Sequence, residues 1–81
     1  MPRYFFHVDN HEASARDETG KELADLEAAR RYALRDIHSI VSEEVASGLL
    51  DLTGHIIITG ELGNTVMKIA YPEAFEIRMP D

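Results

Sequence analysis

Two histidines and an aspartate alternate near the start of the chain, at His7, Asp9 and His11. In an extended strand every second side chain projects from the same face, so these three would point together. Imidazole and carboxylate groups suit zinc and similar divalent ions, and His38 or His55 would add a fourth ligand if the fold brought it close. The alternative is structural, because His11 falls where the strand is expected to end. His7 would then be half exposed on a sheet and His11 would lie in a loop.

A second candidate site lies in the central segment, where Arg31, Arg35 and His38 are spaced by four and three residues. Residues with this spacing share one side of a helix, and a basic stripe of this kind could bind a carboxylate, a phosphate or an acidic partner. The alternative is a solvated helix face on which Glu27 pairs with Arg31, an exposed contact worth about 0.2–0.5 kcal/mol. We favour the solvated face and keep the three residues as candidate binding residues.

The sequence lacks the patterns that catalysis or nucleotide binding would need. It contains no cysteine nucleophile, and its serines do not lie in a nucleophile elbow. The acidic stretch at 9–22 does not follow the spacing of an EF-hand loop, and the glycines at 60 and 63 do not form a phosphate loop. We therefore expect no enzymatic activity and no cofactor.

Length and charge narrow the remaining classes. With 81 residues the chain has room for a single domain, residues 1–81. Its formal net charge of −7 disfavours binding to nucleic acid or to anionic membranes. No stretch approaches the roughly 20 apolar residues of a membrane helix, and the opening residues lack the features of a signal peptide, so we expect a cytoplasmic protein. Small domains without disulfides often gain stability by association, which makes a homo-oligomer the expected state.

The N-terminal segment predicts a strand. Residues 3–8 are aromatic and β-branched, and the alternation of side chains assigns Tyr4, Phe6 and Val8 to the core face. A short return strand is expected at 15–18.

The clearest element is a helix that begins after Asp25, a good N-cap residue, and ends before Gly48, a natural helix stop. Apolar residues recur at spacings of three and four and form one stripe. The stripe consists of Leu26, Ala29, Ala33, Ile37, Ile40, Val41 and Val45. It must be buried against another element.

A second hairpin follows the helix. Residues 55–59 include three consecutive isoleucines, which favour a strand, and residues 65–70 are the matching strand after a connection with two glycines. Residues 73–78 are expected to form a helical turn or a last edge strand. Because a sheet face is the only large partner for the helix stripe, the fold class is α+β. Two β-hairpins form one antiparallel sheet packed against a single long amphipathic helix, in the order β-β-α-β-β.

Five segments carry a resemblance to a known family. They read Met-Pro-Arg-Tyr-Phe-Phe-His at 1–7, Asp-Glu-Thr-Gly at 17–20, Leu-Ala-Asp-Leu-Glu-Ala-Ala-Arg at 23–30, Gly-His-Ile-Ile-Ile at 54–58 and Phe-Glu-Ile-Arg at 75–78. In these segments the chain resembles an uncharacterised family of small, mostly alphaproteobacterial proteins that is described only as a domain of unknown function. The resemblance implies a bacterial cytoplasmic setting and brings no activity or site residues with it.

A looser resemblance is to antitoxins of the HicB type. It rests on the short apolar N-terminal strand, a turn that contains glycine, and the helix pattern in residues 26–33. Those antitoxins have one further strand after the helix, often followed by a DNA-binding segment, whereas this chain has a second hairpin. The likeness is therefore one of architecture.

These features predict a non-catalytic protein-interaction or regulatory module that acts as a homo-oligomer, through exposed strand edges or an uncovered apolar sheet face. They give no identity for a further protein partner. Two alternatives stay open. One is a small-ligand or metal-binding protein that uses the N-terminal histidines or the helix arginines. The other is an antitoxin-like partner of a basic protein, to which an acidic surface is suited.

Overall fold

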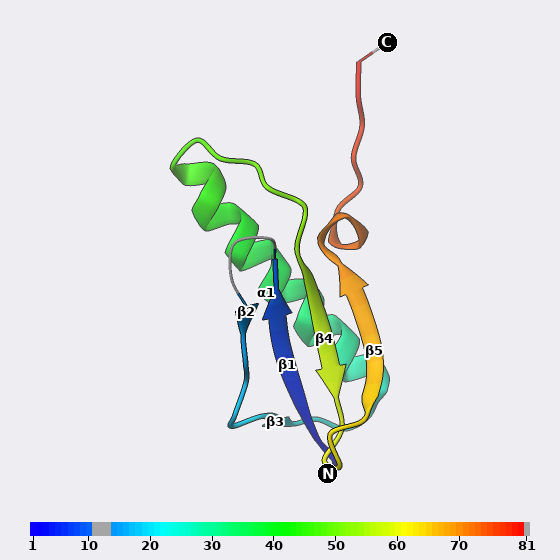
Figure 1. Ribbon diagram of the computed structural model, residues 1–81. Helices are drawn as coiled ribbons and strands as arrows, with labels where there is room; N and C mark the ends of the chain where they lie inside the picture. Colours follow the sequence, from blue (N-terminus) through cyan, green and yellow to red (C-terminus); the bar gives the residue numbers. More distant parts are fainter. Residues whose placement is uncertain (11–13, 81) are drawn as a thin grey trace.

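The computed structural model describes residues 1–10 and 14–80, which form one antiparallel sheet and one long helix (Figure 1). The strands are β1 (Arg3–Asp9), β2 (Ser14–Ala15), β3 (Lys21–Glu22), β4 (His55–Thr59) and β5 (Thr65–Ala70). Strands β2, β1, β4 and β5 lie in that order across the sheet, and β3 pairs with the opposite end of β1. The expected α+β fold, with strands before and after the helix, is confirmed.

The first strand has the face assignment that its sequence predicts. Phe6 is buried, and Tyr4 and Val8 are partly buried against the same core. Along its length β1 pairs with β4, the first strand after the helix, so residues about 50 positions apart in the chain form the centre of the sheet. Strand β5 then returns beside β4 as the predicted second hairpin.

The predicted return strand at 15–18 is wrong in its bounds, because the chain pairs with β1 in two short pieces, β2 and β3. Between them the Asp17 carboxylate accepts hydrogen bonds from the backbone amides of Phe6, Thr19 and Gly20. Gly20 has a φ of 73°, a conformation that favours glycine. A turn held by an aspartate side chain therefore replaces the middle of the strand.

The helix α1 (Leu26–Ala46) begins and ends at the predicted signals. Asp25 is the N-cap, and its Oδ1 accepts a hydrogen bond of 2.8 Å from the amide of Ala28. Beyond the last turn Gly48 has a φ of 93°, which ends the helix. In the part of the chain that the structure describes, no helix has both the length and the apolar content needed to cross a membrane.

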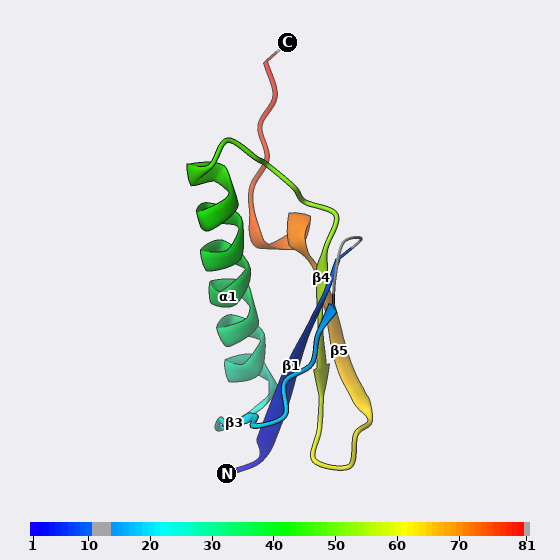
Figure 2. The ribbon, with the colours of Figure 1, turned by 60° about the vertical axis from the view of Figure 1, so that its left-hand side comes forward.

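One face of the sheet is covered by α1, and the other face is left uncovered (Figure 2). The two ends of the predicted apolar stripe, Leu26 and Val45, remain 36% and 50% exposed. In the middle of the stripe Ala29, Ala33, Ile37 and Val41 are buried, and Ile40 is partly buried. The buried core consists of Phe6, Ala29, Ala33, Ile37, Val41, Ile56, Ile58, Ile69 and Tyr71.

After β5 the chain leaves the sheet. Proline cannot donate to a strand ladder, and the 3₁₀ turn η1 (Tyr71–Ala74) begins at the residue before Pro72. Of the two structures expected for 73–78, the helical turn is therefore the one that forms, and it starts two residues earlier. Residues 75–80 then extend away from the sheet at the same end of the molecule as the C-terminus of α1 (Figure 1).

Candidate functional site

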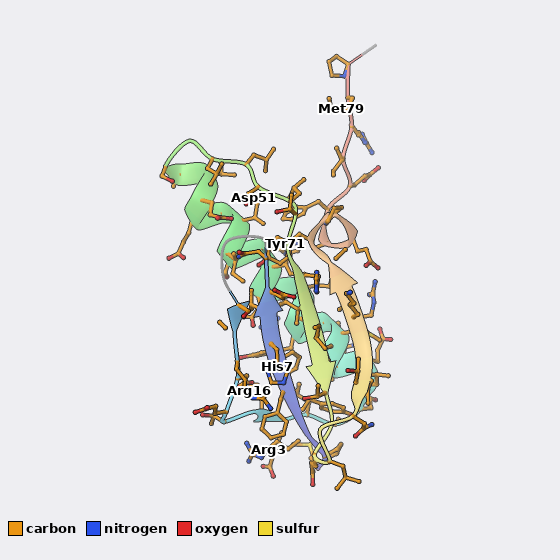
Figure 3. All side chains as sticks on the ribbon, viewed as in Figure 1. Arg3, His7, Arg16, Asp51, Tyr71 and Met79 are labelled. Atoms are coloured by element: carbon orange, nitrogen blue, oxygen red, sulfur yellow. The ribbon has the colours of Figure 1, made fainter. Side chains whose placement is uncertain are left out.

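His7 lies on the sheet face that α1 leaves uncovered, and both of its ring nitrogens have partners. Its Nε2 is 3.0 Å from Thr59 Oγ1, and the backbone N–H of Asp17 donates to its Nδ1 at 3.1 Å. Because Nδ1 accepts a hydrogen bond, the neutral ring carries its proton on Nε2 and donates it to Thr59. His7 therefore joins β1 to β4 and to the turn that follows β2, as its central position in Figure 3 illustrates.

Asp9 faces His55 across the β1–β4 ladder, with 3.3 Å between Asp9 Oδ2 and His55 Nε2. Of the two histidines expected to supply an additional ligand, the fold thus brings His55 to the N-terminal site, whereas His38 contacts η1. His11 lies outside the described residues, so its convergence with His7 and Asp9 stays a prediction. Within residues 1–10 and 14–80, no group of three or more histidines and carboxylates could hold a metal ion.

Asp17 anchors the turn between β2 and β3 and is not among the predicted site residues. Burial acts to raise its pKa, but the three amide hydrogen bonds, with a smaller electrostatic effect of the neighbouring His7, outweigh burial and lower the pKa from 3.8. The local sequence did contain the signal, since an aspartate followed two and three residues later by Thr19 and Gly20 is typical of a side-chain-closed turn.

The three predicted binding residues of the helix do not stay together. Arg31 lies 3.6 Å from Glu27, with side chains 65% and 68% exposed, so this pair contributes little. His38 turns towards η1, where its Nε2 donates to the Ala74 carbonyl oxygen at 2.6 Å. Its ring also packs at a tilt on Phe75, with 5.0 Å between the ring centres. His38 therefore connects the helix to the C-terminal segment and is separate from the arginines.

In place of His38, the fold brings Lys21 to the arginines. Lys21, Arg31 and Arg35 line one groove of about 370 Å³. The Nζ of Lys21 lies 5.4 Å from the centre of the Tyr32 ring, over its face. Sequence spacing could not indicate this grouping, because Lys21 belongs to β3 and reaches the helix only through the pairing of β3 with β1.

A shallow depression on α1 combines residue types that occur in hydrolases, but their geometry does not suit catalysis. Asp36, His38 and Ser39 all line it. Burial, and next the negative charge of Asp17, raises the pKa of Asp36, as a general acid would require. However, His38 is bonded to the Ala74 carbonyl, and among the described residues no hydrogen bond joins it to a serine. The depression therefore offers no serine activated by a base.

An apolar groove lies at the end of the molecule where α1, the loop after it and the C-terminal segment meet. The groove has a volume of about 360 Å³ and is lined mainly by apolar side chains, those of Val41, Leu50, Leu52, Phe75, Ile77 and Met79. Glu76 and Arg78 complete the lining and pair with each other at 2.8 Å. Figure 3 shows Met79 far along the segment that rises above this end.

Exposed apolar side chains gather around this groove. Of the eight large hydrophobic residues that are exposed in the described part of the chain, five come from the segments that meet here. We call these five residues the apolar end: Val45, Leu49, Leu50, Ile77 and Met79, with exposures of 50%, 47%, 66%, 53% and 79%. Of these five, Leu50, Ile77 and Met79 line the groove itself. An exposed apolar lining of this kind is typical of an interaction site.

A family model described as a domain of unknown function, DUF6894, matches residues 3–72 of the chain. The chain belongs to this family. No curated protein and no solved structure matches the chain.

The DUF6894 match divides the candidate sites between the domain and the segment after it. His7, Asp9 and the groove of Lys21, Arg31 and Arg35 all lie within residues 3–72. The apolar end lies across the boundary, since Val45, Leu49 and Leu50 belong to the matched domain and Ile77 and Met79 follow it.

Proposed function

We propose that this DUF6894 protein is a non-catalytic protein-interaction module that associates with a second copy of itself through the apolar end. The observation that supports this proposal is one apolar groove lined by the exposed side chains of Leu50, Ile77 and Met79, with Val45 and Leu49 exposed at the adjoining end of α1 and its loop. A domain of this size buries a limited core, and covering exposed apolar area contributes about 25 cal/mol per Å². Two copies that meet at this end would each cover the exposed apolar side chains of the other.

Charge at the apolar end also suits a second copy. The whole chain carries a formal charge of −7, so most pairs of surfaces on two copies would repel. The two charged residues of the groove, Glu76 and Arg78, have opposite signs and are already paired. In a two-fold arrangement, where each copy presents the same patch, Arg78 of one copy can meet Glu76 of the other. This pairing would offset part of the repulsion between the acidic residues near this end, Glu43, Glu44 and Asp51.

The uncovered sheet face is the less suitable contact surface. It carries Phe5 and Ile57, but the positions around them are occupied by the polar side chains of His7, Asp9 and His55. Burying these groups would require new hydrogen-bond partners. We therefore assign association to the apolar end rather than to this face, and we retain a bacterial cytoplasmic setting as part of the proposal.

Sedimentation velocity at micromolar concentration tests the proposal with Leu50→Glu. We expect the unchanged protein to sediment as a dimer. Full burial of one leucine contributes about 1.5–3 kcal/mol and a two-fold dimer buries two, so Leu50→Glu should raise the Kd at least about tenfold. The matched control is Leu62→Glu, because Leu62 is 95% exposed but lies in the β4–β5 turn at the opposite end (Figure 1). A strictly monomeric unchanged protein, or equal dissociation by Leu62→Glu, would contradict the proposal.

A further inference from the structure

The groove beside β3 gathers positive charge on an otherwise acidic protein. Lys21, Arg31 and Arg35 all line it, whereas the chain as a whole has a formal charge of −7. The lysine comes from β3 and the arginines from successive turns of α1. Two different elements therefore converge to present three cations to one space.

Within residues 1–10 and 14–80, two of these cations have no acidic partner. In this part of the chain the Arg35 side chain makes no hydrogen bond or ion pair, and the Lys21 ammonium lies over the face of the Tyr32 ring. Arg31 is held loosely, since its nitrogen is 3.6 Å from Glu27 and both side chains are about two-thirds exposed. An incoming anion can therefore recruit all three without breaking a strong internal interaction.

The remaining lining of the groove is apolar. Leu23, Ala28 and Tyr32 lie between and beside the cations. One side of the Tyr32 ring packs on Phe6, with 4.8 Å between the ring centres, which fixes the ring in place. The groove volume of about 370 Å³ falls in the range of small-molecule sites, roughly 300–1,000 Å³. A ligand with a compact apolar body and an anionic group would fit both parts of the lining.

We propose that this groove binds a phosphate monoester whose organic group is small and apolar. Charge decides in favour of the phosphate over a carboxylate. A phosphate monoester carries about −1.5 to −2 at neutral pH and has three acceptor oxygens, which match two arginines and a lysine better than the single charge of a carboxylate does. The organic group would lie against Leu23 and Ala28. This site is independent of self-association, because the apolar end belongs to other segments of the chain.

The experiment is an NMR titration of the ¹⁵N-labelled full chain with phenyl phosphate, inorganic phosphate and benzoate at physiological ionic strength. We expect phenyl phosphate to shift the amide signals around Lys21 and of residues 28–35. Inorganic phosphate should bind more weakly because it lacks the apolar group, and benzoate more weakly because it carries one charge. Binding of benzoate as tight as that of phenyl phosphate would overturn the assignment to phosphate, as would the absence of saturable shifts with phenyl phosphate.

Four variants separate a built site from general attraction of anions. Arg35→Gln and Lys21→Gln each remove one charged donor and should weaken phenyl phosphate binding about tenfold. Lys68→Gln makes the same charge change on β5, on the sheet face away from α1 and outside both grooves, and should leave the affinity unchanged. Glu27→Gln releases Arg31 and should strengthen binding about twofold. Equal weakening by Lys68→Gln, or no weakening by either groove variant, would overturn the proposal.

Discussion

At the end of the molecule that holds the N-terminus and the β4–β5 turn, hydrogen bonds close the chain on itself, whereas the opposite end leaves apolar side chains open (Figure 1). At the first end the Arg3 guanidinium donates to the Thr19 carbonyl at 3.0 Å. The Arg3 amide donates to the Glu61 carboxylate at 2.9 Å, and Asp17 accepts three further amides. We call this the hydrogen-bonded end.

The apolar end combines hydrogen bonds with apolar packing. Beneath it the Tyr71 ring is buried against the backbone of Gly54, and the Tyr71 amide donates to the Gly54 carbonyl at 2.9 Å. Above it Ile77 and Met79 extend beyond the core and remain more than half exposed. The difference indicates that interactions within one chain satisfy the hydrogen-bonded end, while the apolar end keeps exposed hydrophobic surface that a second copy could cover.

The largest expected effect comes from crowding the packed base of the apolar end with Gly54→Ala. A methyl group on Gly54 would lie 2.7 Å from Cζ of Tyr71 and 3.1 Å from Cβ of Asn10. Tyr71 is only 2% exposed and belongs to the buried core, so a movement of its ring would disturb that core. We expect urea denaturation to show a loss of about 2–3 kcal/mol in the free energy of unfolding.

Gly48→Ala is the matched control, because it adds the same methyl group at a glycine near the same end. Gly48 has a φ of 93°, and nothing lies within 4 Å of the added carbon. Gly48→Ala should therefore lower the free energy of unfolding through backbone strain alone, by about 1 kcal/mol. If the two substitutions lower the free energy of unfolding equally, crowding against Tyr71 is not the reason that position 54 requires glycine.

The elements could be predicted from the sequence wherever a local signal was strong. The helix has a capping aspartate at one end, a glycine stop at the other and an apolar period between them, so both of its ends were found. The three isoleucines of β4 identified a strand in the same way. The prediction of a return strand at 15–18 was wrong because the Asp17 carboxylate accepts hydrogen bonds from backbone amides and so competes with the strand ladder there. Strand propensity does not include that competition.

The candidate sites were harder to predict because they depend on contacts between distant segments. The spacing of Arg31 and Arg35 placed them on one side of the helix, and the groove contains both. Spacing also predicted that His38 would lie with these arginines. Instead His38 donates its hydrogen bond to the carbonyl oxygen of Ala74 in η1, 36 residues further along the chain. Spacing could not add Lys21, because only the register of β3 on β1 brings it to the helix.

A smaller loss is expected at the hydrogen-bonded end from Asp17→Asn. The substitution keeps the shape of the side chain but removes the charge that three backbone amides share. Hydrogen bonds to a charged group are stronger than neutral ones, so we expect a loss of about 1.5–2 kcal/mol in the free energy of unfolding near neutral pH. Glu18→Gln makes the same charge change on the exposed neighbouring residue and should stay within about 0.5 kcal/mol of the unchanged protein.

The effect of Asp17→Asn should depend on pH in one direction. The folded-state pKa of Asp17 is below the ordinary value of 3.8, so its contribution is fully present above pH 3.8 and is lost as the pH falls through the folded pKa. The difference in stability between the unchanged protein and the variant should therefore narrow well below pH 3.8. A difference that stays constant in acid would show that the carboxylate charge is not what holds the turn.

The smallest expected effects come from the two ends of α1, which lie at the two ends of the molecule. Asp25→Ala removes the N-cap bond to the Ala28 amide and should cost about 1 kcal/mol. At the other terminus the Ser47 hydroxyl donates to the Glu44 carbonyl at 2.9 Å, but Gly48 already ends the helix there. Ser47→Ala should therefore cost no more than about 0.5 kcal/mol. Thermal unfolding could instead show that Asp25→Ala and Ser47→Ala lower stability equally. The helix would then rely on side-chain hydrogen bonds at both of its termini, and the contrast between the two ends of the molecule would not apply to it.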